Sequence, residues 1–129
     1  MIRRCLLLFA LLQLLYSGIL WACTCAPLTT EDYDSHALIF VGEVEGTAGC
    51  GGNQRTHFVV TEALRGVSVD ERVTVPHSAR PSSSCALTFT PGDSWLIATD
   101  PGADYGLCSP GHRDPTDEEL ADITDALTD

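Results

Sequence analysis

The sequence predicts a mainly β fold, a small closed barrel or sandwich with flanking helices. Several short segments rich in β-branched and aromatic residues are separated by turn signals at regular spacing, as in small all-β domains. The apolar residues take on a helical period only near the C-terminus. At 129 residues the chain has room for one domain of ordinary size and not for two.

The predicted elements begin with a helical turn over residues 31–34, which Thr29 or Thr30 would cap. A strand at residues 36–44 follows, and a glycine-rich loop at residues 46–53 comes after it. Further strands are predicted at residues 55–64, 71–76, 94–99 and 105–108, with a short extended segment at residues 86–89.

The pattern becomes helical after Thr116. Thr116 and Glu119 form a capping box, and Leu120, Ile123 and Leu127 fall on one helical face. This apolar stripe predicts a C-terminal helix that docks on the barrel. Its opposite face is acidic but lacks the glycine-containing loop spacing of a calcium site.

Residues 1–22 have the layout of a secretory signal peptide. A basic start precedes an unbroken apolar run over residues 6–12, and small residues stand before the expected cut after Ala22. As a membrane span the segment is marginal, because polar and small residues interrupt it before it reaches about 20 apolar residues. We expect cleavage, rather than retention as an anchor, with Cys23 as the first residue of a secreted or periplasmic chain.

The chain is strongly acidic, with 18 acidic against 7 basic residues and a net charge of −11. Arg3 and Arg4 would leave with the leader, so the exported chain is more acidic still. Such a field opposes nucleic acid and anionic lipid and favours solubility or basic partners. Of these we expect a solvated acidic coat like that of salt-adapted secreted proteins, with basic partners as the alternative. We expect a signal peptide at 1–22, a barrel domain at 23–112 and an acidic helix and tail at 113–129.

Cysteines dominate the expected site. An exported chain meets an oxidising compartment, so pairing is expected, but the number left after leader removal is odd. We predict that Cys50, in the glycine-rich loop, stays unpaired or joins two molecules. The cysteines beyond the leader are Cys23, Cys25, Cys50, Cys85 and Cys108.

Other chemistries have weaker support. Cys23 and Cys25 could form half of a zinc site, but no second closely spaced pair follows, and the histidines are scattered. A redox Cys-x-x-Cys motif is absent from the sequence. Ser83, His77 and Asp93 match a hydrolase triad by residue type alone, because no glycine elbow surrounds the serine. We therefore expect no enzymatic activity, no catalytic residues and no cofactor.

Four places carry a family pattern: Cys23-Thr24-Cys25-Ala26-Pro27 after the leader, Phe40-Val41-Gly42 in the first long strand, Cys85 after a serine-containing connector, and Cys108-Ser109 near the domain end. At these places the sequence resembles the netrin-like modules, in particular the N-terminal domain of the tissue inhibitors of metalloproteinases. The resemblance implies a five-stranded OB-type Greek-key barrel with flanking helices. It also implies disulfides Cys23–Cys85 and Cys25–Cys108.

The resemblance further implies inhibition of zinc metalloendopeptidases. The main-chain nitrogen and carbonyl oxygen of Cys23 would chelate the protease zinc at the position that water otherwise occupies. An α-amine titrates near about 8, so binding should weaken as the pH falls. Thr24 would enter the specificity pocket. The remaining protease contacts would come from Cys25, Ala26, Pro27, Ser82, Ser83 and Ser84.

A second function remains open, a netrin-like binding or structural module without inhibitory activity. Leu20-Trp21-Ala22-Cys23 partly resembles a bacterial lipobox. A lipid on Cys23 would attach the protein to a membrane and consume both the amine and the thiol. The chemical state of Cys23 therefore separates the two functions.

Overall fold

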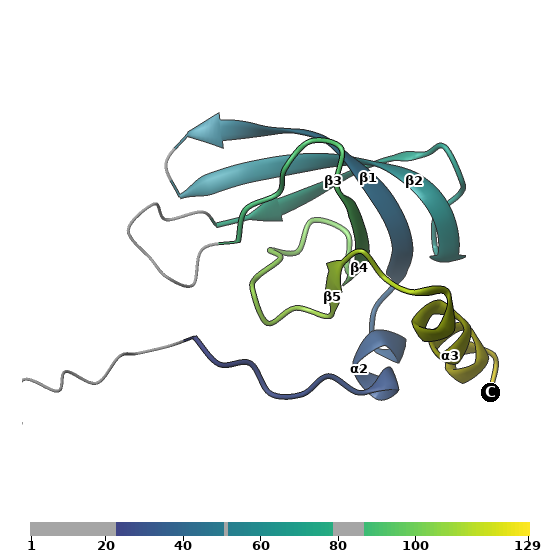
Figure 1. Ribbon diagram of the computed structural model, residues 1–129. Helices are drawn as coiled ribbons and strands as arrows, with labels where there is room; N and C mark the ends of the chain where they lie inside the picture. The colour runs from purple at the N-terminus through teal and green to yellow at the C-terminus, as the bar shows by residue number, and fades with distance from the viewer. Residues whose placement is uncertain (1–22, 51, 79–86) are drawn as a thin grey trace, which may run out of the picture.

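The computed structural model describes residues 23–50, 52–78 and 87–129, which form one five-stranded antiparallel sheet flanked by two helices (Figure 1). The mainly β fold and its flanking helices are confirmed. The elements are α2 (Thr30–Asp34), β1 (Leu38–Cys50), β2 (Asn53–Arg65), β3 (Arg72–His77), β4 (Ser94–Thr99), β5 (Gly111–Arg113) and α3 (Asp117–Thr128).

The sheet has the order β3-β2-β1-β4-β5, with every neighbouring pair antiparallel. An isolated parallel bridge joins His77 at the end of β3 to Tyr105 in the segment before β5. The Tyr105 backbone N–H donates to the carbonyl oxygen of Pro76 over 2.8 Å, but Pro76 has no N–H with which to extend a ladder. The sheet is therefore not closed, unlike the closed barrel expected, and resembles the partly open barrels of OB architecture.

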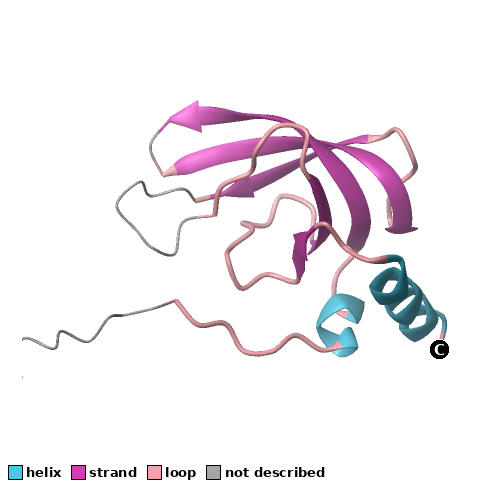
Figure 2. Cartoon of the chain, in the orientation of Figure 1, coloured by secondary structure: helices cyan, strands magenta, loops and turns pink. Residues whose placement is uncertain are grey.

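The two longest strands form a continuous hairpin, which Figure 2 shows as two strands side by side. β1 and β2 stay paired as far as Cys50 and Asn53, so the predicted loop at residues 46–53 is wrong. One of the glycines is required by close backbone approach within the ladder: Gly49 has a φ of +130°, and a Cβ there would collide with the carbonyl oxygen of Asn53.

The predicted strand at residues 105–108 is also wrong. That segment forms a turn, in which the Gly106 N–H donates to Ser109 Oγ over 2.8 Å and the Ser109 N–H donates to the Gly106 carbonyl over 3.0 Å. The last strand begins at Gly111, whose φ of +140° and lack of room for a Cβ exclude other residues. Only Tyr105 of this segment is buried, and its isolated bridge to His77 does not extend into a ladder.

Apolar side chains pack on both faces of the sheet. On one face the ring of Phe89 packs edge-on against Phe58, His77 and Trp95. Phe89 lies outside the strands, so residues 87–89, the described part of the extended segment predicted at 86–89, supply core side chains without joining the sheet. The other face is covered by α2 and α3, whose packed side chains include Tyr33, Leu120, Ile123 and Leu127.

The C-terminal helix is confirmed in detail. Thr116 is its N-cap, its side chain accepts from the Glu119 N–H, and the Glu119 carboxylate accepts from the Thr116 N–H over 2.8 Å. Leu120 and Ile123 are buried, and Leu127 packs beside them. The apolar stripe and the capping box together fix where α3 begins and which face it buries.

Candidate functional site

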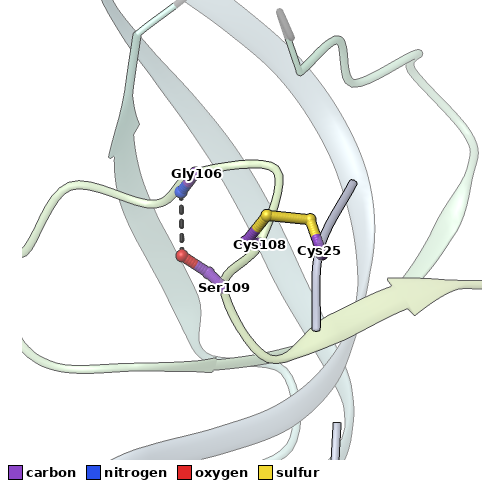
Figure 3. Close-up of a disulfide and its surroundings, with 4 residues drawn as sticks. All are labelled: Cys25, Gly106, Cys108 and Ser109. Carbon is purple, nitrogen blue, oxygen red and sulfur yellow. Dashed lines mark hydrogen bonds between the residues drawn. A yellow bond between two sulfur atoms is a disulfide. The ribbon is translucent and has the colours of Figure 1, made fainter. Parts of the chain in front are cut away.

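The candidate site is the N-terminal segment, residues 23–29, an irregular stretch before α2. A disulfide between Cys25 and Cys108 attaches this segment to the turn before β5, with the two Cα atoms 5.3 Å apart (Figure 3). This bond is one of the two pairings that the family resemblance implies. It is also typical of proteins that fold in an oxidising compartment outside the cytoplasm.

The turn that carries Cys108 is held on both sides. Before it, Tyr105 is buried, and its hydroxyl donates to the Pro110 carbonyl over 2.9 Å. Burial raises the pKa of Tyr105 far above its usual value, so the phenol stays protonated as a donor. After it, the Ala98 N–H donates to the same Pro110 carbonyl over 3.0 Å. Cys25 is therefore bonded to a turn that the sheet itself supports.

The segment exposes the residues expected to contact a partner. Thr24, Ala26 and Pro27 are exposed, whereas Cys23 and Cys25 are partly buried. Cys23 is also disulfide-bonded. Its expected partner Cys85, like Ser82, Ser83 and Ser84, lies outside the described residues. Within the described residues, the disulfide-bonded Cys23 is thus followed directly by an exposed side chain, that of Thr24.

Cys50 lies on a different element. It is an exposed free cysteine at the end of β1, not in a loop. The structure thus separates this thiol, at the β1–β2 hairpin, from the disulfide that attaches the N-terminal segment beside β5.

The alternative sites find no support in the part of the chain that the structure describes. No group of three or more His, Cys, Asp or Glu side chains there is arranged to hold a metal. Cys25 is in a disulfide and cannot be a zinc ligand. His77 bonds to Thr56, Asp93 lies 3.6 Å from Arg113, and no hydrogen bond joins His77 to Asp93 within the described residues, which do not include Ser83. Within residues 23–50, 52–78 and 87–129, the helices are too short or too polar to traverse a bilayer.

Sequence reasoning missed a chain of hydrogen-bonded side chains that leads from the exposed Thr47 in β1 to the buried His77 at the end of β3. Thr47 Oγ1 lies 2.7 Å from Thr56 Oγ1, which lies 2.7 Å from His77 Nε2. His77 is only 2% exposed, and its Nδ1 has no hydrogen-bond partner among the described atoms. The signal was the inward register of Val73, Val75 and His77 in β3, which places the histidine in the core.

Burial lowers the pKa of His77, which predicts a loss of stability in mild acid. The unfolded chain takes up the proton near pH 6.5, whereas the folded chain resists it, so stability is complete above about 6.5 and falls as the pH drops toward the folded pKa. Urea unfolding at pH 7.5 and pH 5 should show this loss. In His77→Gln, which can keep the bond to Thr56, the free energy of unfolding should fall less between pH 7.5 and pH 5 than in the parent protein. An equal fall in both proteins would contradict the assignment of this pH dependence to His77.

Comparison with known proteins identifies no family for this chain, because no protein-family model and no curated protein matches it.

Proposed function

We propose that this protein is an exported inhibitor of zinc metalloendopeptidases and that it acts through the main-chain nitrogen and carbonyl oxygen of Cys23. The observation that carries the proposal is the Cys25–Cys108 disulfide, which holds an exposed cysteine-rich segment against the barrel. The resemblance of this segment to the tissue inhibitors of metalloproteinases supplies the class of target.

The chemistry requires the removal of residues 1–22, which would make Cys23 the amino terminus. A catalytic zinc is held by three protein ligands and keeps one position for water or substrate. The α-amine and the adjacent carbonyl oxygen of one residue close a five-membered ring on a metal, so Cys23 could take that position. The amine must be neutral to bind, and the zinc favours the neutral form.

Preorganisation explains why a barrel would present so short a segment. Ordering a backbone costs about 1–2 kcal/mol per residue, so a disordered pentapeptide over residues 23–27 would lose roughly 5–10 kcal/mol on binding. The disulfide at Cys25 imposes part of this order in advance. Pro27 also fixes its own backbone dihedral φ. Both features favour binding without adding contacts.

The disulfide at Cys23 argues against one form of the rival function, a non-inhibitory netrin-like module anchored by a lipid, because the lipid would be attached through the Cys23 sulfur. A module whose Cys-x-Cys only staples the barrel remains the alternative, and the protease titration below separates it from the inhibitor. A protein purified with lipid on Cys23 would instead favour the anchored module.

Thr24 is the residue expected to set selectivity, because its exposed side chain directly follows the proposed zinc ligand. In Thr24→Gly, each protease should lose the contacts of this side chain according to the fit of its pocket, by up to roughly 1–3 kcal/mol. Inhibition constants measured over several zinc endopeptidases should therefore change by unequal factors. Thr128→Gly, at the far end of the chain, is the control. A uniform or absent effect of Thr24→Gly would refute the pocket assignment.

The proposal is tested by titrating the purified exported protein against a panel of zinc endopeptidases. We expect tight inhibition of at least one member, competitive with a small chelating inhibitor of its active site. Absence of inhibition across the panel, or binding unaffected by the chelating inhibitor, would contradict the proposal.

A further inference from the structure

A pocket of about 290 Å³ lies between the N-terminal segment, α2 and α3, on the helix-covered side of the sheet, where Figure 1 shows α2 beside α3. Leu28, Tyr33 and Ile123 form its apolar wall, and Glu119 and Asp122 supply carboxylates. The volume is just below the roughly 300–1,000 Å³ of small-molecule sites. The pocket therefore suits one side chain better than a whole metabolite.

Tyr33 lines this pocket and brings a hydroxyl group to it. The residue is only 7% exposed, but its hydroxyl is not one of the buried side-chain atoms that lack a hydrogen-bond partner. A tyrosine hydroxyl has an apolar ring behind it and acts as both donor and acceptor. Burial raises the pKa of Tyr33, and the carboxylates of Glu119 and Asp32 raise it further, so the neutral hydroxyl faces negative charge. Such a hydroxyl can accept a hydrogen bond from a cationic donor.

The α2 end of the pocket is fixed in place by Arg65. Its guanidinium donates to the Asp34 carboxylate over 2.6 Å and to the Asp34 carbonyl over 2.7 Å, which ties α2 to the end of β2. Tyr33, one residue earlier, is consequently held against α3 rather than at the end of a mobile helix. The pocket is formed before any partner arrives.

The charges around the pocket are unbalanced. Hydrogen bonds with the Thr116 N–H and then with His112 lower the pKa of Glu119, so this carboxylate is ionised. Both groups already bind the Glu119 carboxylate, which leaves it less available to a partner. Asp122 is exposed and has no ion-pair partner in the part of the chain that the structure describes. Neither α2 nor α3 carries a basic residue in its last turn. A cation entering the pocket would meet the charge of Asp122 unopposed.

The apolar wall fits the rest of a basic side chain. Leu28 is 42% exposed, one of the few large hydrophobic residues on the described surface. Lysine and arginine lay their aliphatic stems along such surfaces while the charged group stays at a polar rim. We propose that this pocket binds a lysine or arginine side chain on the surface of a partner protein, with the stem on Leu28 and Ile123 and the cation between Asp122 and the Tyr33 hydroxyl.

The test uses an arginine-containing tetrapeptide amide, capped at its N-terminus, and amide chemical shifts of the exported protein. This probe contains no protease, so the outcome does not depend on the inhibitor function. We expect shifts centred on Leu28, Tyr33 and Asp122 that saturate, and no such shifts with a peptide carrying norleucine in place of arginine. Shifts spread evenly over the acidic surface, or equal effects of both peptides, would overturn the proposal.

Matched variants sharpen the test. Asp122→Asn should weaken binding of the peptide about fivefold, the upper end of what one exposed ion pair contributes. Tyr33→Phe, which removes only the hydroxyl proposed to accept from the cation, should also weaken binding of the peptide. Asp104→Asn, which neutralises an exposed carboxylate before β5, is the control and should bind as the parent does. If Asp104→Asn weakens binding as much as Asp122→Asn, the attraction is diffuse and the pocket is not the site.

Discussion

Adding one alanine before Cys23 should weaken inhibition of any susceptible zinc endopeptidase roughly 100-fold or more, a loss of about 3 kcal/mol. The added peptide bond converts the basic α-amine of Cys23 into an amide nitrogen, which has no lone pair available for zinc. It also places an extra residue where the chelate must approach the metal. Inhibition constants of the parent and the extended protein, measured side by side, check this result.

The matched control carries the same alanine after Asp129, at the end of α3, where no protease contact is proposed. Both extended proteins should unfold at the parent temperature, because neither addition touches the core. Equal inhibition by the two would exclude chelation through Cys23 while leaving the barrel intact.

Removing the Cys25–Cys108 disulfide should have the second large effect. The bond closes a loop with a sequence separation of 83, worth about 4–5 kcal/mol in the chain-entropy model. That is a large share of the roughly 5–15 kcal/mol by which domains are stable. A protein with Cys25→Ser and Cys108→Ser should unfold at markedly lower urea concentration. It should also inhibit more weakly at temperatures where it remains folded, because the N-terminal segment is no longer held before binding.

Cys50→Ser is the control for this prediction. Cys50 is exposed and unpaired at the end of β1, so its replacement should change neither the urea midpoint nor inhibition. If the double variant keeps the parent's inhibition when folded, the disulfide stabilises the barrel without preorganising the segment.

The parts of the fold that local pattern determines were predictable. The strand at residues 94–99 has the predicted bounds, since a continuous buried run stands between two turn signals. The helix after Thr116 followed from its cap and its stripe. The fifth strand was not predictable in this way, because Gly111–Arg113 becomes a strand only by pairing with Trp95, Leu96 and Ile97. The glycines at 46–49 led to the wrong prediction of a loop for a related reason. A glycine within a strand ladder and a glycine in a turn cannot be distinguished by sequence alone.

The candidate site, like the fold, was predictable only in part from the sequence. The Cys-x-Cys segment is evident in the sequence, but four cysteines allow three pairings, and only the family resemblance chose among them. The bond from His77 to Thr56 depends on the register between β2 and β3, and the pocket beside Tyr33 depends on how α2 and α3 meet. Both are long-range arrangements that no local pattern reveals.

The central claim, that the Cys23 amine is the zinc ligand, can be tested without changing the sequence. The chain contains no lysine, so once residues 1–22 are removed its only amine is the α-amine of Cys23. Treatment with an amine-selective acetylating reagent should add one acetyl group by intact mass and abolish inhibition. A singly acetylated protein that inhibits as well as the untreated protein would contradict the claim, and so would a protein that takes up no acetyl group because its terminus is already blocked.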